Sequence, residues 1–250
     1  MKVVEQANLP EMAKKVITGE KYSHLLKKPL EKLGLDPMFI PDNGFVDPRL
    51  SGHADLSVLH LGGNQLWLAP YLRGSDFSSR LSTMGLALHY PDILQSAVYP
   101  GDAQMNVCIC GKFAICGVPV VPKEIVDLLT TSGLKIINCR QGYAKCSVCV
   151  VDAGSIITAD RGIEAAARKA GLETLLIEPG YIALDGFPHG FIGGSAFKIS
   201  RSKLAFTGIL DGHKNKNQIL SFLDRHQVEP IYLTEMPIFD IGSGIPLMEK

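Results

Sequence analysis

The sequence lacks an excess of charge of either sign. Its 25 Lys and Arg side chains balance 25 Asp and Glu side chains over 250 residues, so the formal net charge is zero at pH 7. Proteins that bind nucleic acid or anionic membranes use surplus positive charge to neutralise phosphates. The charge balance therefore argues against a nucleic-acid partner and against a membrane partner.

Targeting signals and long apolar runs are also missing. The first six residues include two charges and no apolar core, so no signal peptide is visible. Lys112 interrupts the best candidate span, between Ala103 and Val121. No uncharged stretch reaches the ~18 apolar residues that are needed to cross a bilayer. We therefore expect the protein to stay in the cytoplasm.

Cysteine is scarce, with six residues in the whole chain, all between Cys108 and Cys149. This number is too small for a disulfide scaffold, and thiols are expected in a reducing compartment. Cys108-x-Cys110 and Cys146-x-x-Cys149 resemble zinc ligands, but residues three apart in a strand point to opposite faces.

Nucleotide-binding and zinc-protease motifs are absent too. We expect no metal and no cofactor.

What the sequence does contain is an apolar fraction of 46%, with 25 Gly and 15 Pro. This composition supplies a core and many turns. No linker or low-complexity segment divides the chain, so a single domain is predicted over residues 1–250.

Short apolar runs occur in pairs around turn residues, which is typical of β-hairpins. The four pairs are Asp55–His60 with Gln65–Ala69, Met105–Cys110 with Phe113–Gly117, Cys146–Val151 with Ser155–Thr158, and Ala196–Ile199 with Leu204–Thr207. Helical segments then start at Asp76 (through Leu86), Pro122, Asp160 (as N-cap) and about Lys214. The last three lead to the predicted strands Leu134–Asn138, Thr174–Ile177 and Pro230–Leu233. The pattern predicts ββαβ modules.

A fifth module forms only if the tail of the chain joins its head. The tail, Ile238–Leu247, would pair near an amphipathic segment that ends at about Leu33 and precedes Met38–Pro41. Closure by both termini is one way in which a ring of repeats is locked. The predicted fold class is therefore α/β, a propeller of five ββαβ modules closed by the N- and C-terminal segments.

A five-module ββαβ ring of this size resembles the pentein fold, the α/β propeller of guanidine-group-modifying enzymes such as arginine deiminases, dimethylarginine hydrolases and amidinotransferases. The sequence looks closest to a bacterial branch of that superfamily with no established reaction. The motifs that carry this resemblance are Ser51–Asp55 (SGHAD), Gly142–Cys146 (GYAKC), His189–Gly194 (HGFIGG) and Asp240–Ser243 (DIGS).

The resemblance implies a central funnel that holds a small substrate, with His189 as the family's histidine and Asp55 as its first-module carboxylate. The family's nucleophile is a cysteine in the last module, whereas this chain has no cysteine after Cys149 and carries Asp240–Ser243 there. Cys146 instead falls at a third-module position that is usually a carboxylate. The usual C-terminal catalytic cysteine is thus missing.

Six residues are candidates for a site. Cys146 is the predicted nucleophile, because a thiolate near a protonated His189 would have a lowered pKa and could attack an amidine carbon. Asp55 completes the catalytic set. His53 lies two residues before Asp55, so the two side chains are predicted to share one face of a strand. His53, Asp240 and Ser243 are predicted to bind the substrate.

Each candidate also has a structural interpretation. A free cysteine often behaves as a small buried hydrophobe, an aspartate at a hairpin often satisfies backbone groups, and Asp240–Ser243 reads equally as a turn. Glycines around His189 suit either a ligand or a plain loop.

Two functions follow from these readings. The first is an enzyme of hydrolase or deiminase type that acts on a small guanidine, amidine or amino-acid-like substrate. The second is a non-catalytic pentein that binds a metabolite or a protein partner, since the superfamily includes ring-shaped members that bind ribosomal subunits without chemistry. The sequence does not indicate the substrate or the oligomeric state.

Overall fold

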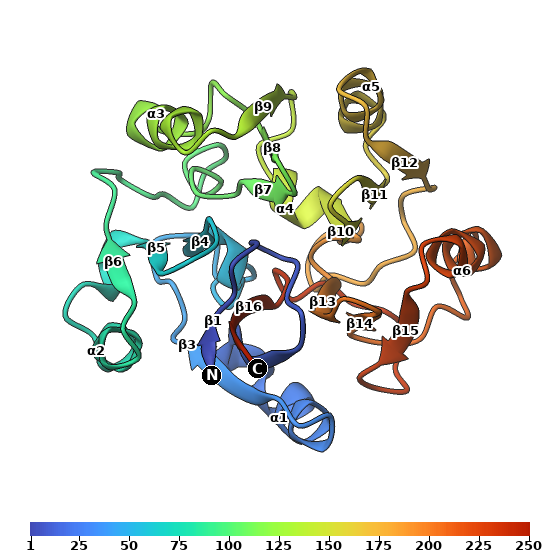
Figure 1. Ribbon diagram of the computed structural model, residues 1–250, viewed down its shortest axis with the longest axis horizontal. Coiled ribbons are helices and arrows are strands. Elements are labelled where there is room, and N and C mark those ends of the chain that lie inside the picture. Colours follow the sequence, from blue (N-terminus) through green and yellow to red (C-terminus); the bar gives the residue numbers. More distant parts are fainter.

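Five small β-sheets surround a common axis in the computed structural model, which describes residues 1–250 (Figure 1). Four of the sheets have three strands, in which an antiparallel pair is followed by a helix and a parallel third strand. The predicted ββαβ module and the predicted five-module ring are both confirmed.

The four three-stranded modules follow one another along the chain. Module one contains β4 (Val58–His60), β5 (Gln65–Leu68), α2 (Asp76–Thr83) and β6 (Ala87–His89). Module two contains β7 (Cys108–Cys110), β8 (Phe113–Cys116), α3 (Lys123–Thr131) and β9 (Lys135–Asn138). Module three contains α4 (Ala144–Ser147), β10 (Val148–Asp152), β11 (Ser155–Thr158), α5 (Arg161–Lys169) and β12 (Glu173–Leu176). Module four contains β13 (Ala196–Ser200), β14 (Lys203–Phe206), α6 (Lys216–Arg225) and β15 (Glu229–Tyr232).

Both ends of the chain build the fifth module, as predicted. Its sheet has the order β1-β16-β2-β3, and the elements are β1 (Lys2–Val3), β2 (Ala13–Gly19), α1 (Ser23–Lys32), β3 (Asp36–Ile40) and β16 (Ile245–Glu249). The C-terminal strand β16 lies antiparallel to both β1 and β2. The two termini therefore lie close together and close the ring (Figure 1).

Three predicted strands begin later than expected, and one of them, Met105–Cys110, is strand only from Cys108 (β7). The segments Asp55–His60 and Cys146–Val151 each start with a helical turn, the 3₁₀ helix Ala54–Leu56 and helix α4, before β4 and β10 begin. Apolar composition did not reveal these turns because they are held by distant partners, described below. The helix predicted to run from Asp76 to Leu86 ends at Thr83, shortly before Gly85 takes a positive φ of 84°.

The apolar core is divided among the boundaries between modules. Each of five clusters of buried side chains joins two neighbouring modules; one, for example, combines Cys108 and Ile115 of module two with Val148 and Ile156 of module three. The apolar side chains thus lie between the blades of the ring, and polar residues occupy its axis. None of the helices has the length and hydropathy that crossing a membrane requires.

Leu247→Ala tests how far ring closure stabilises the fold. Leu247 lies in β16, is fully buried and packs in the cluster between modules five and one. We expect the substitution to lower the free energy of unfolding by about 2–5 kcal/mol, as buried Leu→Ala changes do. Leu33→Ala, at a side chain that is 41% exposed, is the matched control. Equal losses in urea denaturation of the two variants would contradict a stabilising role for β16.

Candidate functional site

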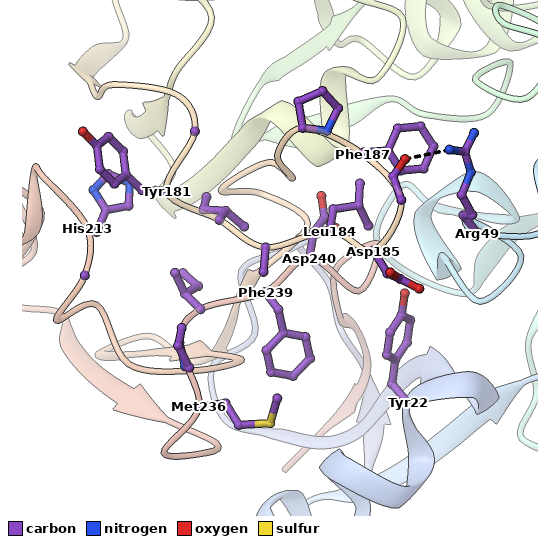
Figure 2. A pocket seen from close by; sticks show the side chains of 18 of the residues that line it. Tyr22, Arg49, Tyr181, Leu184, Asp185, Phe187, His213, Met236, Phe239 and Asp240 are labelled. Carbon is purple, nitrogen blue, oxygen red and sulfur yellow. Dashed lines mark hydrogen bonds between the residues drawn. The ribbon is translucent and has the colours of Figure 1, made fainter.

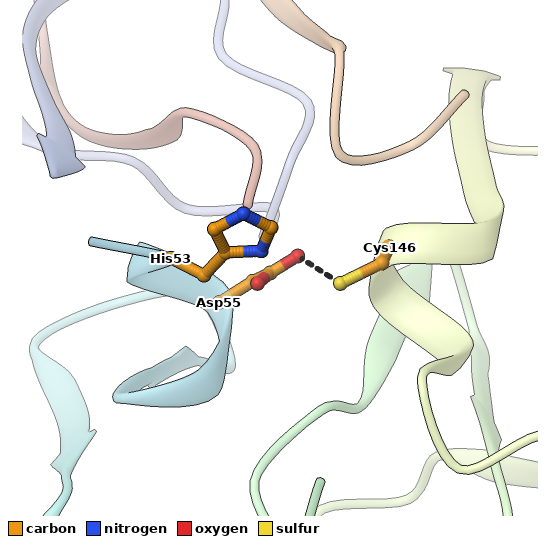
Figure 3. A group of neighbouring side chains, drawn as sticks. All are labelled: His53, Asp55 and Cys146. Carbon is orange, nitrogen blue, oxygen red and sulfur yellow. Dashed lines mark hydrogen bonds between the residues drawn. The ribbon is translucent and has the colours of Figure 1, made fainter. Parts of the chain in front are cut away.

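Residues just before the first strands of the modules meet on the axis of the ring. His53 and Asp55 lie at the 3₁₀ helix before β4, and Cys146 lies on α4 before β10. Figure 3 shows the three side chains pointing toward one another. The Cys146 thiol donates a hydrogen bond to Asp55 Oδ2 with a separation of 2.9 Å. The prediction that His53 and Asp55 share a strand face is wrong, because they lie at a helical turn rather than in a strand. The turn brings their ligand atoms close together instead.

Asn106 holds these two turns in place. Its Oδ1 accepts hydrogen bonds from the backbone N–H groups of Lys145 (2.6 Å) and Cys146 (3.1 Å), which lie in the single turn of α4. Its Nδ2 lies 3.2 Å from both the Asp55 carbonyl oxygen and Cys146 Sγ. One fully buried amide side chain therefore links modules one, two and three around the thiol.

Asp240 forms the opposite side of the cluster. One of its carboxylate oxygens accepts a hydrogen bond from the N–H of Phe191 (2.8 Å), and the other accepts from the N–H of Gly242 (2.9 Å). The latter oxygen also lies 4.0 Å from His53 Nδ1. A Cβ atom at Gly194 would overlap this carboxylate. Glycine near His189 thus makes room for the Asp240 side chain.

Burial sets the protonation of the thiol. Desolvation raises the pKa of Cys146 well above its usual value, and the negative charges of Asp55 and Asp240 raise it further. The lowered pKa expected from a protonated His189 is therefore wrong, because burial and carboxylates surround the sulfur. Burial likewise raises the pKa of Asp240, an effect that the nearby His53 opposes.

An inner cavity of about 240 Å³ opens onto this cluster. Four of the candidate residues line it: His53, Cys146, His189 and Asp240. The other lining residues are apolar or aromatic: Leu50, Tyr143, Leu184, Phe187, Pro188 and Phe191. The site therefore combines a thiol, a carboxylate and two imidazoles with largely apolar walls. Such a combination is typical of small-molecule sites.

A second, outer cavity of about 760 Å³ also borders the segment Leu184–Pro188, and Figure 2 shows side chains that line it. Leu184, Phe187, Pro188 and Asp240 line both cavities, so this segment forms the wall between them. Arg49 contacts this segment at two points. Its guanidinium donates a hydrogen bond to the Gly186 carbonyl oxygen (2.6 Å) and lies 4.1 Å from the centre of the Phe187 ring.

Two candidate residues stand apart from the cluster. Ser243 is fully buried and has a positive φ of 67°. Its hydroxyl accepts a hydrogen bond from Lys145 Nζ (2.8 Å). Ser243 lines neither cavity. His189 is half-buried, and its Nδ1 lies 3.0 Å from the Gly190 carbonyl oxygen. His189 therefore reaches the inner cavity, whereas the Ser243 side chain is buried outside it.

The remaining cysteines are structural. Cys149 lies in β10, whereas Cys146 lies on α4. The Cys149 side chain packs in the apolar cluster between modules three and four. Burial there raises the pKa of its thiol to about 12. Cys108 packs in the cluster between modules two and three. The group that could hold a metal is a different one, His53 with Asp55 and Cys146, whose ligand atoms lie within 4.8 Å of one another.

Three residues near the site were missed in the sequence. Asn106 is a polar residue inside an apolar run, and this interruption was the signal that could have found it. Lys145 is buried although it carries a charge. Tyr143 donates a hydrogen bond to Asp102 Oδ2 (2.6 Å), which fixes one wall of the inner cavity.

Known structures share this architecture. An amidinotransferase of the saxitoxin biosynthetic pathway from Microseira wollei matches with a TM-score of 0.61 at 11% identity, over 99% of this chain and 97% of that chain. The inosamine-phosphate amidinotransferase of Streptomyces griseus matches with a TM-score of 0.60 at 12% identity, over 100% and 98%. Agmatine deiminase from C. jejuni matches with a TM-score of 0.55 at 11% identity, over 93% and 90%.

These likenesses show that the chain has the pentein fold that the sequence predicts. Residues 17–245 match the family described as a family of unknown function (DUF6873), and the chain belongs to that family. No curated protein matches the sequence. The structural neighbours are guanidine-modifying enzymes, and at such low identity they establish the architecture alone.

Asp55→Asn tests the electrostatic control of the thiol. Removing the negative charge beside Cys146 is expected to lower the thiol pKa, and each unit of that fall raises the thiolate fraction about tenfold. Cys146 should then react faster with iodoacetamide at pH 8, measured by peptide mass spectrometry. Asp185→Asn, at an exposed carboxylate, is the control. A rate in Asp55→Asn equal to or below that of the unmodified protein would show that Asp55 does not control the thiol.

Proposed function

We propose that this protein is an enzyme that hydrolyses a C–N bond of a small guanidine or amidine, with Cys146 as its nucleophile. The observation that carries this proposal is that Cys146, His189, His53 and Asp240 line one cavity, with Asp55 hydrogen-bonded to the thiol. The structural neighbours are amidinotransferases and an agmatine deiminase, and their activities support the same substrate class.

The walls of the inner cavity favour a flat cation. Tyr143, Phe187 and Phe191 offer aromatic faces, and the buried carboxylate of Asp240 offers the opposite charge. A guanidinium or amidinium is planar, so it can stack on a ring and donate hydrogen bonds to a carboxylate at once. The volume of about 240 Å³ lies below the ~300–1,000 Å³ of common ligand pockets. A small substrate, or the head group of a larger one, suits this space.

A bound cation would also activate the thiol. In the free protein, burial and two carboxylates keep Cys146 protonated. A positive charge placed in the cavity favours the thiolate, because it offsets the two negative charges beside the sulfur. The thiol proton then passes to Asp55 Oδ2, which already accepts its hydrogen bond. The nucleophile is therefore formed only when substrate is present.

The reaction needs no reagent except water. Cys146 Sγ forms a bond to the central carbon of the substrate, and the C–N bond to the leaving amine breaks as His189 supplies a proton to the nitrogen. Water then adds to the same carbon, His189 takes its proton, and the C–S bond breaks. A guanidine plus water thus gives a urea plus ammonia or an amine. Asp240 orients the cation, with His53 beside it.

A second candidate function is binding of a small cation without chemistry. The raised pKa of Cys146 favours it, because a protonated thiol is a poor nucleophile. In that case the protein would bind a guanidine in calorimetry, and neither it nor a Cys146 variant would convert the ligand.

Cys146→Ala separates the two functions. In a screen of small guanidines and amidines, read out by release of ammonia and of ureido product, we expect turnover to fall by at least about a thousandfold, as when other nucleophiles are removed. Cys149→Ala is the matched control, since this thiol packs in the core and faces no cavity. Unchanged turnover of an identified substrate by Cys146→Ala would overturn the assignment of the nucleophile.

A further inference from the structure

His53, Asp55 and Cys146 offer the mixed nitrogen, oxygen and sulfur donors of a metal site. Their ligand atoms lie within 4.8 Å of one another, and the residues are 3%, 1% and 2% exposed. Zn²⁺ and similar borderline-soft ions accept this donor set, whereas Mg²⁺ and Ca²⁺ prefer oxygen alone. The chemistry of the three side chains therefore selects a zinc-like ion.

Two buried polar atoms of this group lack hydrogen-bond partners. They are His53 Nε2 and Asp55 Oδ1. The other imidazole nitrogen, His53 Nδ1, has its ion-pair partner Asp240 at 4.0 Å, beyond hydrogen-bond distance. Buried polar groups are nearly always paired, so unpaired atoms in a native site call for an explanation. An ion bound by the Asp55 carboxylate and by His53 Nδ1, the nitrogen that faces Asp55 and Cys146 in Figure 3, supplies one for Asp55 Oδ1.

The geometry needs only small movements. Bonds of about 2.3 Å to sulfur and about 2.0 Å to nitrogen place tetrahedral ligands roughly 3.5 Å apart. The Asp55 and Cys146 atoms, now 2.9 Å apart, would separate slightly, and the most distant pair would close by about 1 Å. His53 and Cys146 both face the inner cavity, which leaves room for water at the fourth position.

The surrounding charges also favour a cation. Asp240 adds a further carboxylate, with one oxygen 4.0 Å from His53 Nδ1, and it is fixed by two backbone N–H groups. The negative charges of Asp55 and Asp240 therefore attract a cation to this group of side chains.

We propose that His53, Asp55 and Cys146 bind one Zn²⁺-like ion, with the fourth position open to the inner cavity. Binding forms a bond between the metal and Cys146 Sγ, and the thiol proton is released to solvent. The bound ion protects Cys146 from alkylation, because the sulfur lone pair is then shared with the metal. This proposal does not depend on the hydrolytic function, since metal binding and alkylation are both measured without a substrate.

Titration with Co²⁺ tests the site directly. The full chain should bind one equivalent and develop a near-ultraviolet thiolate-to-cobalt band together with the intense visible bands of a tetrahedral ion. Zn²⁺ should displace the Co²⁺, release a proton, and slow the reaction of Cys146 with iodoacetamide. Absence of the thiolate band in the unmodified protein would overturn the proposal.

Single substitutions assign the ligands. Cys146→Ser should abolish the thiolate band, and His53→Gln and Asp55→Asn should each weaken Co²⁺ binding by about tenfold or more, a loss that even outer-shell changes cause. Cys149→Ala, which removes a core thiol, should bind as the unmodified protein does. A thiolate band that persists in Cys146→Ser, or unchanged affinity in both His53→Gln and Asp55→Asn, would show that the ion binds elsewhere.

Discussion

The hydrogen bond between Cys146 and Asp55 is the interaction around which the site is organised. It joins a turn of module one to a turn of module three, and both partners are removed from water. A thiolate and a carboxylate at 2.9 Å would repel each other strongly in such surroundings, so the pair holds a proton between them. Burial and the neighbouring carboxylates raise the pKa of Cys146 and keep the thiol protonated in the free protein. A positive charge in the cavity would lower this pKa, because it offsets the two negative charges.

The architecture explains how a polar cluster of this kind is tolerated. Five apolar clusters at the module boundaries supply the core, so the axis of the ring does not have to be apolar. Asn106 satisfies two backbone donors of α4 and contacts the thiol, while backbone N–H groups of Phe191 and Gly242 satisfy Asp240. Hydrogen bonds of this kind offset the cost of burying the polar groups that make them.

The order of the modules could be predicted from the sequence, because hairpin turns, helix caps and apolar runs each depend on residues that are close together in the chain. Asp160 illustrates this point: it caps α5 through a hydrogen bond from the Ile163 N–H (2.8 Å), as its position predicted. Ring closure by the two ends was also predictable, since β16 had no partner near it in sequence. The meeting of Asp55, Cys146 and Asp240 on one axis then followed from the family resemblance.

The local geometry of the site could not be predicted in the same way. The turns that contain Asp55 and Cys146 were read as strand, because their apolar composition continues into β4 and β10. Their helical shape depends on Asn106, which lies 39 residues before Lys145. The pKa of Cys146 was predicted with the wrong sign for a related reason: burial and neighbouring charge are properties of the folded ring.

In the proposed mechanism, the reactivity of Cys146 depends on a cation bound in the inner cavity. The most direct measurement compares its labelling by 2-chloroacetamidine, a planar cation, with labelling by the neutral 2-chloroacetamide, each corrected for the rate with free cysteine. We expect the cation to react selectively with Cys146 and to show the higher corrected rate of the two. Equal corrected rates, or labelling of other cysteines in preference to Cys146, would contradict it.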